Sequence, residues 1–219
     1  MRDMGTGSAI RQTPTSDLRP GTPVVAFDFD GTLTIRDSFT AFMRWRAGPA
    51  RWALGLARLT PAVVTYIGDR DRGRIKAASV KEFLGGLDRV TLEAEAERFA
   101  EFIWPRFIRP DALACWQDWG QKGAHRVIVT ASPEITVAPF ARRLGAEALL
   151  GTHMAFDADD RVTGAFIGPN CRGEEKVRRL RASYGDELQL AAAYGDTSGD
   201  TEMLAFADHA GFRVFTARP

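Results

Sequence analysis

The chain has 219 residues, of which 45% are hydrophobic and 26% are charged, and its formal net charge is +1. This balance is typical of a soluble globular protein, and it excludes a chain that is mainly disordered or mainly membrane-spanning. Two cysteines and three histidines, scattered along the chain, argue against a disulfide framework and against a zinc site. The thiols suit a reducing compartment.

Residues 1–22 are rich in glycine, threonine, serine and proline, and they lack the apolar stretch of a signal peptide. We therefore expect a disordered N-terminal tail on a cytoplasmic protein. The longest apolar region, residues 52–67, is interrupted by Arg58 and Pro61 and is too short to span a bilayer. Peripheral contact with the inner face of a membrane remains open.

Three short apolar runs, each followed by a polar turn, come next in chain order. A continuous apolar run is typical of a parallel strand that is covered on both faces. Helical patterns lie among them at residues 111–122, 133–144 and 174–184, and this alternation predicts an α/β fold with a doubly wound, Rossmann-like parallel sheet. The predicted strands and turns are Val24–Phe27 with residues 28–32, residues 127–129 with 130–133, and residues 190–194 with 195–200.

Two segments depart from this alternation. Residues 152–167 predict a β-hairpin, and residues 39–105 predict a largely helical insertion after the first strand. We expect a core of residues 23–38 and 106–219, with residues 39–105 as a helical cap. The predicted breaks in the insertion are Gly48-Pro49, Pro61, residues 68–73 and Gly85-Gly86.

The polar turns carry a group of acids. Ligands of such sheets bind beyond the carboxyl ends of the strands, where all three turns should meet. Residues two apart on a strand point to the same side, so Asp28 and Asp30 can face one small volume, which requires a cation or a shared proton. In an isolated Asp-x-Asp-Gly segment, one of the two aspartates is commonly a solvated turn residue. Here the pair is accompanied by Asp196, Asp200, Lys176, Thr130 and Ser132.

Clustered carboxylates with one lysine and a hydroxyl suit a hard cation and a phosphoryl group, because magnesium takes oxygen ligands from carboxylates and phosphates. With these residues in this order, the chain resembles the haloacid dehalogenase superfamily from Val24 to the C-terminus. The first and fourth of its motifs are fairly specific, and all four in order make a strong likeness. The matching segments are Asp28-Phe29-Asp30-Gly31-Thr32, Thr130, Lys176 and residues 195–200.

This resemblance implies a role for each catalytic position. Asp28 is the nucleophile, which forms an aspartyl-phosphate and splits one displacement into two. Asp30 is the general acid for the leaving group and then the base for water. Thr130 binds the phosphoryl oxygens, and Lys176 neutralises charge. The substrate-binding residues around them are Gly31, Thr32, Ala131 and Ser132.

The resemblance also implies a Mg²⁺ site. Its ligands are Asp28, the backbone carbonyl of Asp30, and Asp196, while Asp200 either binds through water or orients Lys176. Transport ATPases of the superfamily carry a lysine at the position of Asp30. A carboxylate there favours a phosphatase, that is, a phosphoric monoester hydrolase.

The phosphate-binding hydroxyl is assigned between two residues. Thr130 directly follows the apolar run of residues 127–129, as the motif requires, and we prefer it. Ser132 precedes Pro133, and we expect it to cap the helix that starts there.

The position of the insertion and the segment Asn170–Lys176 resemble subfamily IB, which includes phosphoserine phosphatase, and C-type phosphatidylglycerophosphate phosphatases. Phosphoserine phosphatases commonly have a glutamate seven residues after the second aspartate, where this chain has Asp37. This difference weakens the case for phosphoserine as substrate. The leading candidate is therefore a lipid-linked phosphate such as phosphatidylglycerophosphate, and a phosphorylated small molecule such as phosphoserine is the alternative.

Charge in the insertion bears on this choice. Residues 38–81 hold nine basic and two acidic residues, a net charge of +7, interleaved with aromatic residues such as Trp45 and Trp52. Such a surface suits an anionic lipid interface, although a packed core with a solvated basic face explains it equally well. No nucleic-acid-binding module accompanies it. A non-catalytic regulatory protein of the same fold is the remaining alternative.

Overall fold

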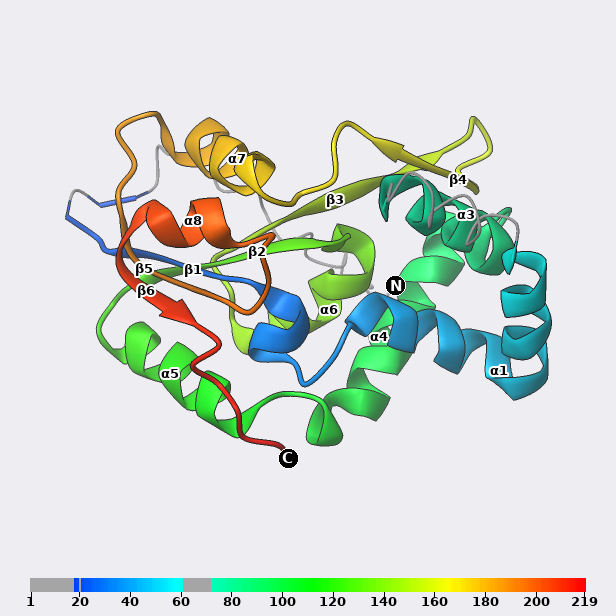
Figure 1. Cartoon of the computed structure of the whole chain (residues 1–219), viewed down its shortest axis with the longest axis horizontal. Coiled ribbons are helices and arrows are strands. Elements are labelled where there is room, and N and C mark those ends of the chain that lie inside the picture. The colour runs from blue at the N-terminus through cyan, green and yellow to red at the C-terminus, as the bar shows by residue number, and fades with distance from the viewer. Residues whose placement is uncertain (1–17, 20, 61–71) are drawn as a thin grey trace, which may run out of the picture.

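The computed structural model describes residues 18–19, 21–60 and 72–219 (Figure 1). Most of the predicted N-terminal tail, the predicted break at Pro61 and residues 68–71 of the next predicted break lie outside these residues. The last two residues of that break, Arg72 and Gly73, begin a helix, so the prediction is wrong there. None of the helices in the described part combines the length and the apolar character needed to cross a bilayer.

A mixed sheet lies at the centre of the described structure. Its six strands have the order β4-β3-β2-β1-β5-β6, and neighbours are parallel except for the antiparallel pair β3 and β4. The predicted parallel sheet is therefore confirmed, with the predicted hairpin at one edge. The strands are β1 (Val24–Phe27), β2 (His125–Pro133), β3 (Ala148–Phe156), β4 (Val162–Ile167), β5 (Leu190–Gly195) and β6 (Ala207–Phe212).

Helices cover both faces of the sheet. Successive strand residues point to opposite faces, so Val25 and Phe27 join the core under one layer while Val24 and Ala26 join the core under the other. The first layer holds α5 (Pro110–Gln121) and α6 (Glu134–Leu144), and the second holds α7 (Glu174–Tyr184) and α8 (Thr201–Ala205) (Figure 1). This is the doubly wound α/β architecture expected from the sequence.

A helical insertion lies between β1 and β2 in the chain. In the described residues it comprises α1 (Ser38–Arg58), α3 (Arg72–Leu84) and α4 (Arg89–Ile103), followed by a short turn, η3 (Trp104–Arg106). The predicted break at Gly48-Pro49 is a kink inside α1, where Gly48 adopts φ 70° and ψ 169°. The predicted break at Gly85-Gly86 separates α3 from α4.

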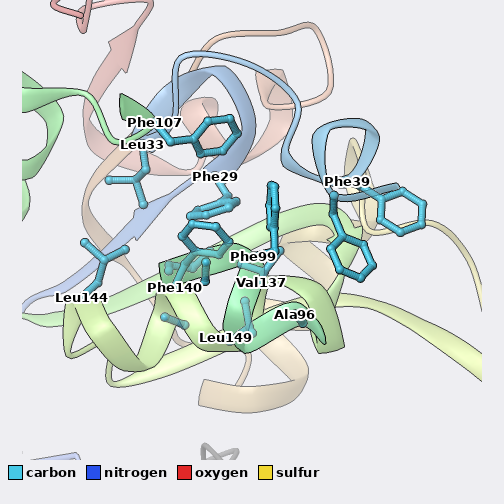
Figure 2. Packing of buried hydrophobic residues seen from close by; sticks show 14 of the residues in the cluster. Phe29, Leu33, Phe39, Ala96, Phe99, Phe107, Val137, Phe140, Leu144 and Leu149 are labelled. Carbon is cyan, nitrogen blue, oxygen red and sulfur yellow. The ribbon is translucent and has the colours of Figure 1, made fainter. Parts of the chain in front are cut away.

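Among the described residues, the insertion packs onto the core through an aromatic cluster and through α3. Aromatic side chains from α4, α6 and the turn after β1 meet, as Figure 2 shows for Phe29, Phe99 and Phe140. At the edge of the sheet, α3 of the insertion packs against the edge strand β4. A Cβ on Gly164 would lie 2.6 Å from the Lys81 Cβ, so this approach needs a glycine.

Two strands differ from the prediction. β2 runs through Pro133, so Thr130 and Ser132 lie in the last residues of the strand instead of in a turn after it. The sequence gives no sign of β6, because Ala207–Phe212 mixes apolar residues with an aspartate, a histidine and a glycine, and it is largely exposed at the sheet edge. An edge strand of this kind has no alternating or continuous apolar pattern.

Candidate active site

The three predicted turns meet at the carboxyl edge of the sheet. Asp28 directly follows β1, and its backbone N–H donates to the Tyr194 carbonyl of β5 at 2.9 Å. The chain then enters a wide helical turn, η2 (Phe29–Leu33). Phe29 is fully buried and packs on Phe140, with ring centroids 5.3 Å apart, which anchors this turn (Figure 2).

Gly31 allows the turn to approach the end of β5. Its φ of +87° lies in the region that favours glycine, and a Cβ there would be 2.2 Å from Asp196 Oδ2. Arg109, at the start of α5, donates through Nε to the carbonyl oxygens of Gly31 and Thr34 at 3.1 and 3.2 Å. These contacts hold Gly31 against Asp196.

Lys176 lies at the centre of the site and is 1% exposed. Its Nζ donates to Asp28 Oδ1 at 2.6 Å, Asp200 Oδ1 at 2.7 Å and the Val129 carbonyl at 2.6 Å. Burial disfavours the ammonium charge, but the two carboxylates outweigh this and raise the pKa of Lys176. The lysine is therefore charged, and it links Asp28 after β1, Val129 within β2 and Asp200 after β5.

Three carboxylates form a group that suits a cation. One oxygen each of Asp28, Asp196 and Asp200 lies within 4.8 Å of the others. Asp196 Oδ1 is buried without a hydrogen-bond partner among the described residues. An orphaned acceptor beside two further carboxylates is the donor set that a hard divalent cation requires, so these residues fit Mg²⁺.

The two acids of the β5 turn have different environments. Burial and the neighbouring charge of Asp200 raise the pKa of Asp196. Burial acts the same way on Asp200, but the charge of Lys176 and hydrogen bonds from Lys176 and Thr197 lower its pKa. Asp200 Oδ2 accepts from the backbone N–H groups of Asp196 and Thr197, while Oδ1 accepts from Lys176. Asp200 therefore contacts Lys176 directly, as the orienting role predicted for it requires, and also lies within the three-carboxylate group.

Asp30 faces a different set of partners from Asp28. Oδ1 of Asp30 accepts from the Ser38 N–H at 2.6 Å, and its Oδ2 accepts from Ser132 Oγ at 2.5 Å. Burial, with the nearby charge of Asp37, raises the pKa of Asp30 to about 6 against the effect of these hydrogen bonds. The Asp30 carboxylate is not part of the three-carboxylate group, because the backbone after Asp28 turns instead of continuing as a strand.

Asp28 has the higher pKa of this pair. Its carboxyl is 7% exposed, and burial raises its pKa to about 7 although the adjacent Lys176 lowers it. The Thr32 hydroxyl donates to Asp28 Oδ2 at 3.3 Å. A bound divalent cation would favour the ionised form of Asp28.

The predicted role of Ser132 as a helix cap is wrong. The residue at the cap position of α6 is Pro133, which makes no side-chain cap, and Ser132 Oγ donates to Asp30 instead. Thr130 is fully buried beside Val129, and its Oγ1 accepts from the Ser132 N–H at 3.0 Å. Both hydroxyls therefore lie at the site.

Sequence reasoning missed two contacts of the insertion with this edge of the sheet. Ser38, which the predicted boundary assigns to the core, is the first residue of α1 and binds Asp30 through its N–H, so we count it with the insertion. Lys76 of α3 donates through Nζ to the Ala131 carbonyl at 2.5 Å and to Asn170 Oδ1 at 3.0 Å. Burial lowers the pKa of Lys76 to about 8. In the sequence, Lys76 is one of nine similar basic residues, so nothing distinguishes it.

The fold and this arrangement define a class. The chain belongs to the haloacid dehalogenase-like hydrolase family, whose sequence model matches residues 25–205. It is 52% identical over 216 residues to protein CicA of Caulobacter vibrioides, covering 99% of this chain and 97% of CicA. It is 29% identical to phosphoserine phosphatase SerB1 of Mycobacterium tuberculosis, covering 87% of this chain and 65% of SerB1. A substrate-bound phosphoserine phosphatase structure has the same fold, with a TM-score of 0.59, 17% identity, and coverage of 86% and 84% of the two chains.

Proposed function

We propose that this chain is a Mg²⁺-dependent phosphatase that hydrolyses phosphate monoesters through an aspartyl-phosphate on Asp28. The observation that carries the proposal is the buried Lys176, whose ammonium lies within 2.7 Å of carboxylate oxygens of both Asp28 and Asp200. Asp196 completes a group that fits a divalent cation. SerB1, a relative over most of this chain, is named as a phosphoserine phosphatase.

In the first step, a carboxylate oxygen of Asp28 attacks phosphorus, and the bond from phosphorus to the alcohol oxygen breaks. Asp30 donates its proton to that oxygen, so the alcohol leaves neutral. In the second step, water attacks the phosphorus of the acyl phosphate and gives a proton to Asp30. The products are phosphate and the free Asp28 carboxylate.

Charge neutralisation supports both steps. Phosphoryl transfer depends mainly on positioning and on neutralising the charge of the transferred group. Lys176 supplies one fixed positive charge, and Thr130 is the preferred hydroxyl donor to the phosphoryl oxygens. Asp28, Asp196 and the backbone carbonyl of Asp30 would hold Mg²⁺, which supplies further positive charge to the phosphoryl oxygens when bound.

A non-catalytic regulatory role is less well supported. Burying a lysine and two carboxylates costs several kcal/mol per ion before pairing. A module that only binds a partner through its surface has no need of such a group. The nucleophile position, acid position, lysine and hydroxyl all converge here.

The substrate is proposed to be a small phosphate monoester. In the insertion, Trp45 contacts Phe99 and Trp52 stacks on Phe83 at 4.6 Å, so both tryptophans pack inward. Arg51 pairs with Glu82, which lies just outside the basic segment of the sequence. These contacts favour the packing interpretation of that segment.

A lipid-linked phosphate, such as phosphatidylglycerophosphate, is the second candidate. It is favoured by Leu54 and Leu56 on α1, which are 49% and 48% exposed beside basic residues. Binding to anionic vesicles at moderate salt would support this candidate, and no binding would remove it, together with peripheral contact with a membrane.

A phosphate-ester panel tests the proposed function. It contains an aryl phosphate, phosphoserine, and phosphatidylglycerophosphate in mixed micelles. We expect phosphate release that EDTA stops and Mg²⁺ restores, whereas Ca²⁺ should not replace it because of its looser coordination geometry. Hydrolysis that continues without any metal, or no hydrolysis of any ester with Mg²⁺ present, would contradict the proposal.

A further inference from the structure

The carboxylate of Asp30 is held from two sides. The Ser38 N–H, which approaches Oδ1, belongs to the first residue of the insertion, and Ser132 Oγ, which approaches Oδ2, belongs to the core strand β2. Ser132 is 4% exposed, so water does not compete freely for this contact. The direction of the Asp30 carboxylate therefore depends on where the Ser132 side chain points.

The peptide unit between Ala131 and Ser132 is itself held at both ends. Its carbonyl oxygen accepts from Lys76 Nζ at 2.5 Å and from Thr152 Oγ1 at 2.7 Å. Its N–H donates to Thr130 Oγ1 at 3.0 Å. Because a peptide unit is planar and rigid, fixing these two groups fixes the plane from which Ser132 projects.

Lys76 brings the insertion into this arrangement. Its ammonium also binds Asn170 Oδ1 at 3.0 Å and lies 4.7 Å from the centre of the Phe166 ring. It is half-buried, and an ammonium removed from water costs free energy unless its donors are used. Lys76 therefore links α3 to Ala131, which lies between the two hydroxyl residues of the site.

We propose that Ser132 and Lys76 are positioning residues for Asp30: Ser132 orients the carboxylate directly, and Lys76 acts through the Ala131–Ser132 peptide unit. The inference rests on the proposed function, in which Asp30 transfers the proton. It means that Asp30 is correctly oriented only while the insertion lies against the core, because Lys76 and Ser38 both belong to the insertion.

A double-mutant cycle tests this coupling. Ser132→Ala should lower kcat by about 10- to 100-fold with KM changed less than about threefold, because a displaced acid slows proton transfer in both steps. Lys76→Met should lower kcat by about tenfold. Adding Lys76→Met to Ser132→Ala should lower kcat by no more than about a further twofold, because both substitutions disturb the same orientation of Asp30.

Lys81→Met is the matched control, since Lys81 is an exposed lysine on the same helix, and it should leave kcat unchanged. Losses in the double variant that multiply would overturn the coupling. A rise in KM without a fall in kcat for Ser132→Ala would show that Ser132 binds phosphate instead of positioning Asp30.

A second measurement does not depend on turnover. Amide hydrogen exchange in peptides that cover Ser132 and Ser38 should be faster in Lys76→Met than in the wild type or in Lys81→Met. Unchanged exchange would overturn the inference even for an inactive protein. If the wild type hydrolyses no phosphate ester but exchange changes as expected, the proposed function fails while the coupling stands.

Discussion

Asp28 and Asp30 are two residues apart in the chain, yet different parts of the molecule hold them. The Asp28 carboxylate contacts Lys176 and Thr32, which both belong to the core. The Asp30 carboxylate contacts Ser132 of the core and Ser38 at the start of the insertion. The group that would bind phosphorus is thus built into the sheet edge, whereas the group that would move the proton depends on the insertion.

The stability of the core should depend strongly on the single charge of Lys176, which contacts Asp28. Lys176→Met would leave Asp28 and Asp200 buried and unpaired, which costs about 3–5 kcal/mol. For a protein of this size, about 2–4 °C is lost per kcal/mol. We therefore expect the melting temperature of the metal-free protein to fall by roughly 6–20 °C, with loss of activity, in calorimetry and phosphate-release assays.

The control is an ion pair at the surface. Lys122 pairs with Asp118 at 2.6 Å, but the two side chains are 57% and 54% exposed. Lys122→Met should change the melting temperature by no more than about 4 °C, because exposed pairs contribute about 0–1 kcal/mol. Equal effects of the two substitutions would show that Lys176 is not the buried centre of the site.

Magnesium and pH should act together on stability. The pKa values of Asp28 and Asp30, about 7 and about 6, are above the ordinary value of 3.8. A raised folded-state pKa means that the protonated form stabilises the fold, so this contribution is complete below about pH 4 and is lost as pH rises through 6 and 7. Without metal, melting temperature should therefore fall between pH 5 and pH 8 more steeply than in Asp28→Asn.

Mg²⁺ should reverse this loss. At about one hundred times its dissociation constant, a ligand that binds only the folded state adds about 2.7 kcal/mol, or roughly 5–10 °C. The gain should be larger at pH 8 than at pH 5, since the carboxylates must be ionised to bind the cation. A gain that is independent of pH would argue against these ligands.

A smaller effect is expected at Gly31, which lies between the two regions. Gly31→Ala places a Cβ at 2.2 Å from Asp196 Oδ2 and requires a non-glycine residue at a φ of +87°. Such strain costs about 1–3 kcal/mol. We expect a lower melting temperature and about tenfold weaker Mg²⁺ binding by titration calorimetry.

Gly86→Ala separates backbone strain from the contact with Asp196. Gly86 also has a positive φ, +76°, but a Cβ there meets nothing within 4 Å. It should lose stability without losing Mg²⁺ affinity. Equal Mg²⁺ affinity in the Gly31 variant and the wild type would contradict the proposed position of the cation.

The sequence predicted the core side of the comparison better than the insertion side. Asp28 and Asp196 directly follow strands with clear apolar patterns, so their convergence could be inferred from the carboxyl ends of parallel strands. The place of Lys176 beside them was implied by the resemblance to the family. The contact of Ser132 with Asp30 joins residues 102 apart in sequence, and that of Lys76 with Ala131 joins residues 55 apart. Such contacts depend on packing between layers, which no local pattern encodes.

The central claim is that Asp28 carries the phosphoryl group. Asp30→Asn should slow hydrolysis of the intermediate, so rapid quenching of this variant with a phosphate ester and Mg²⁺, followed by peptide mass spectrometry, should find phosphate on Asp28. The same variant with Asp28→Asn added should carry none. Phosphate on another residue, or turnover by Asp28→Asn at the wild-type rate, would contradict the account.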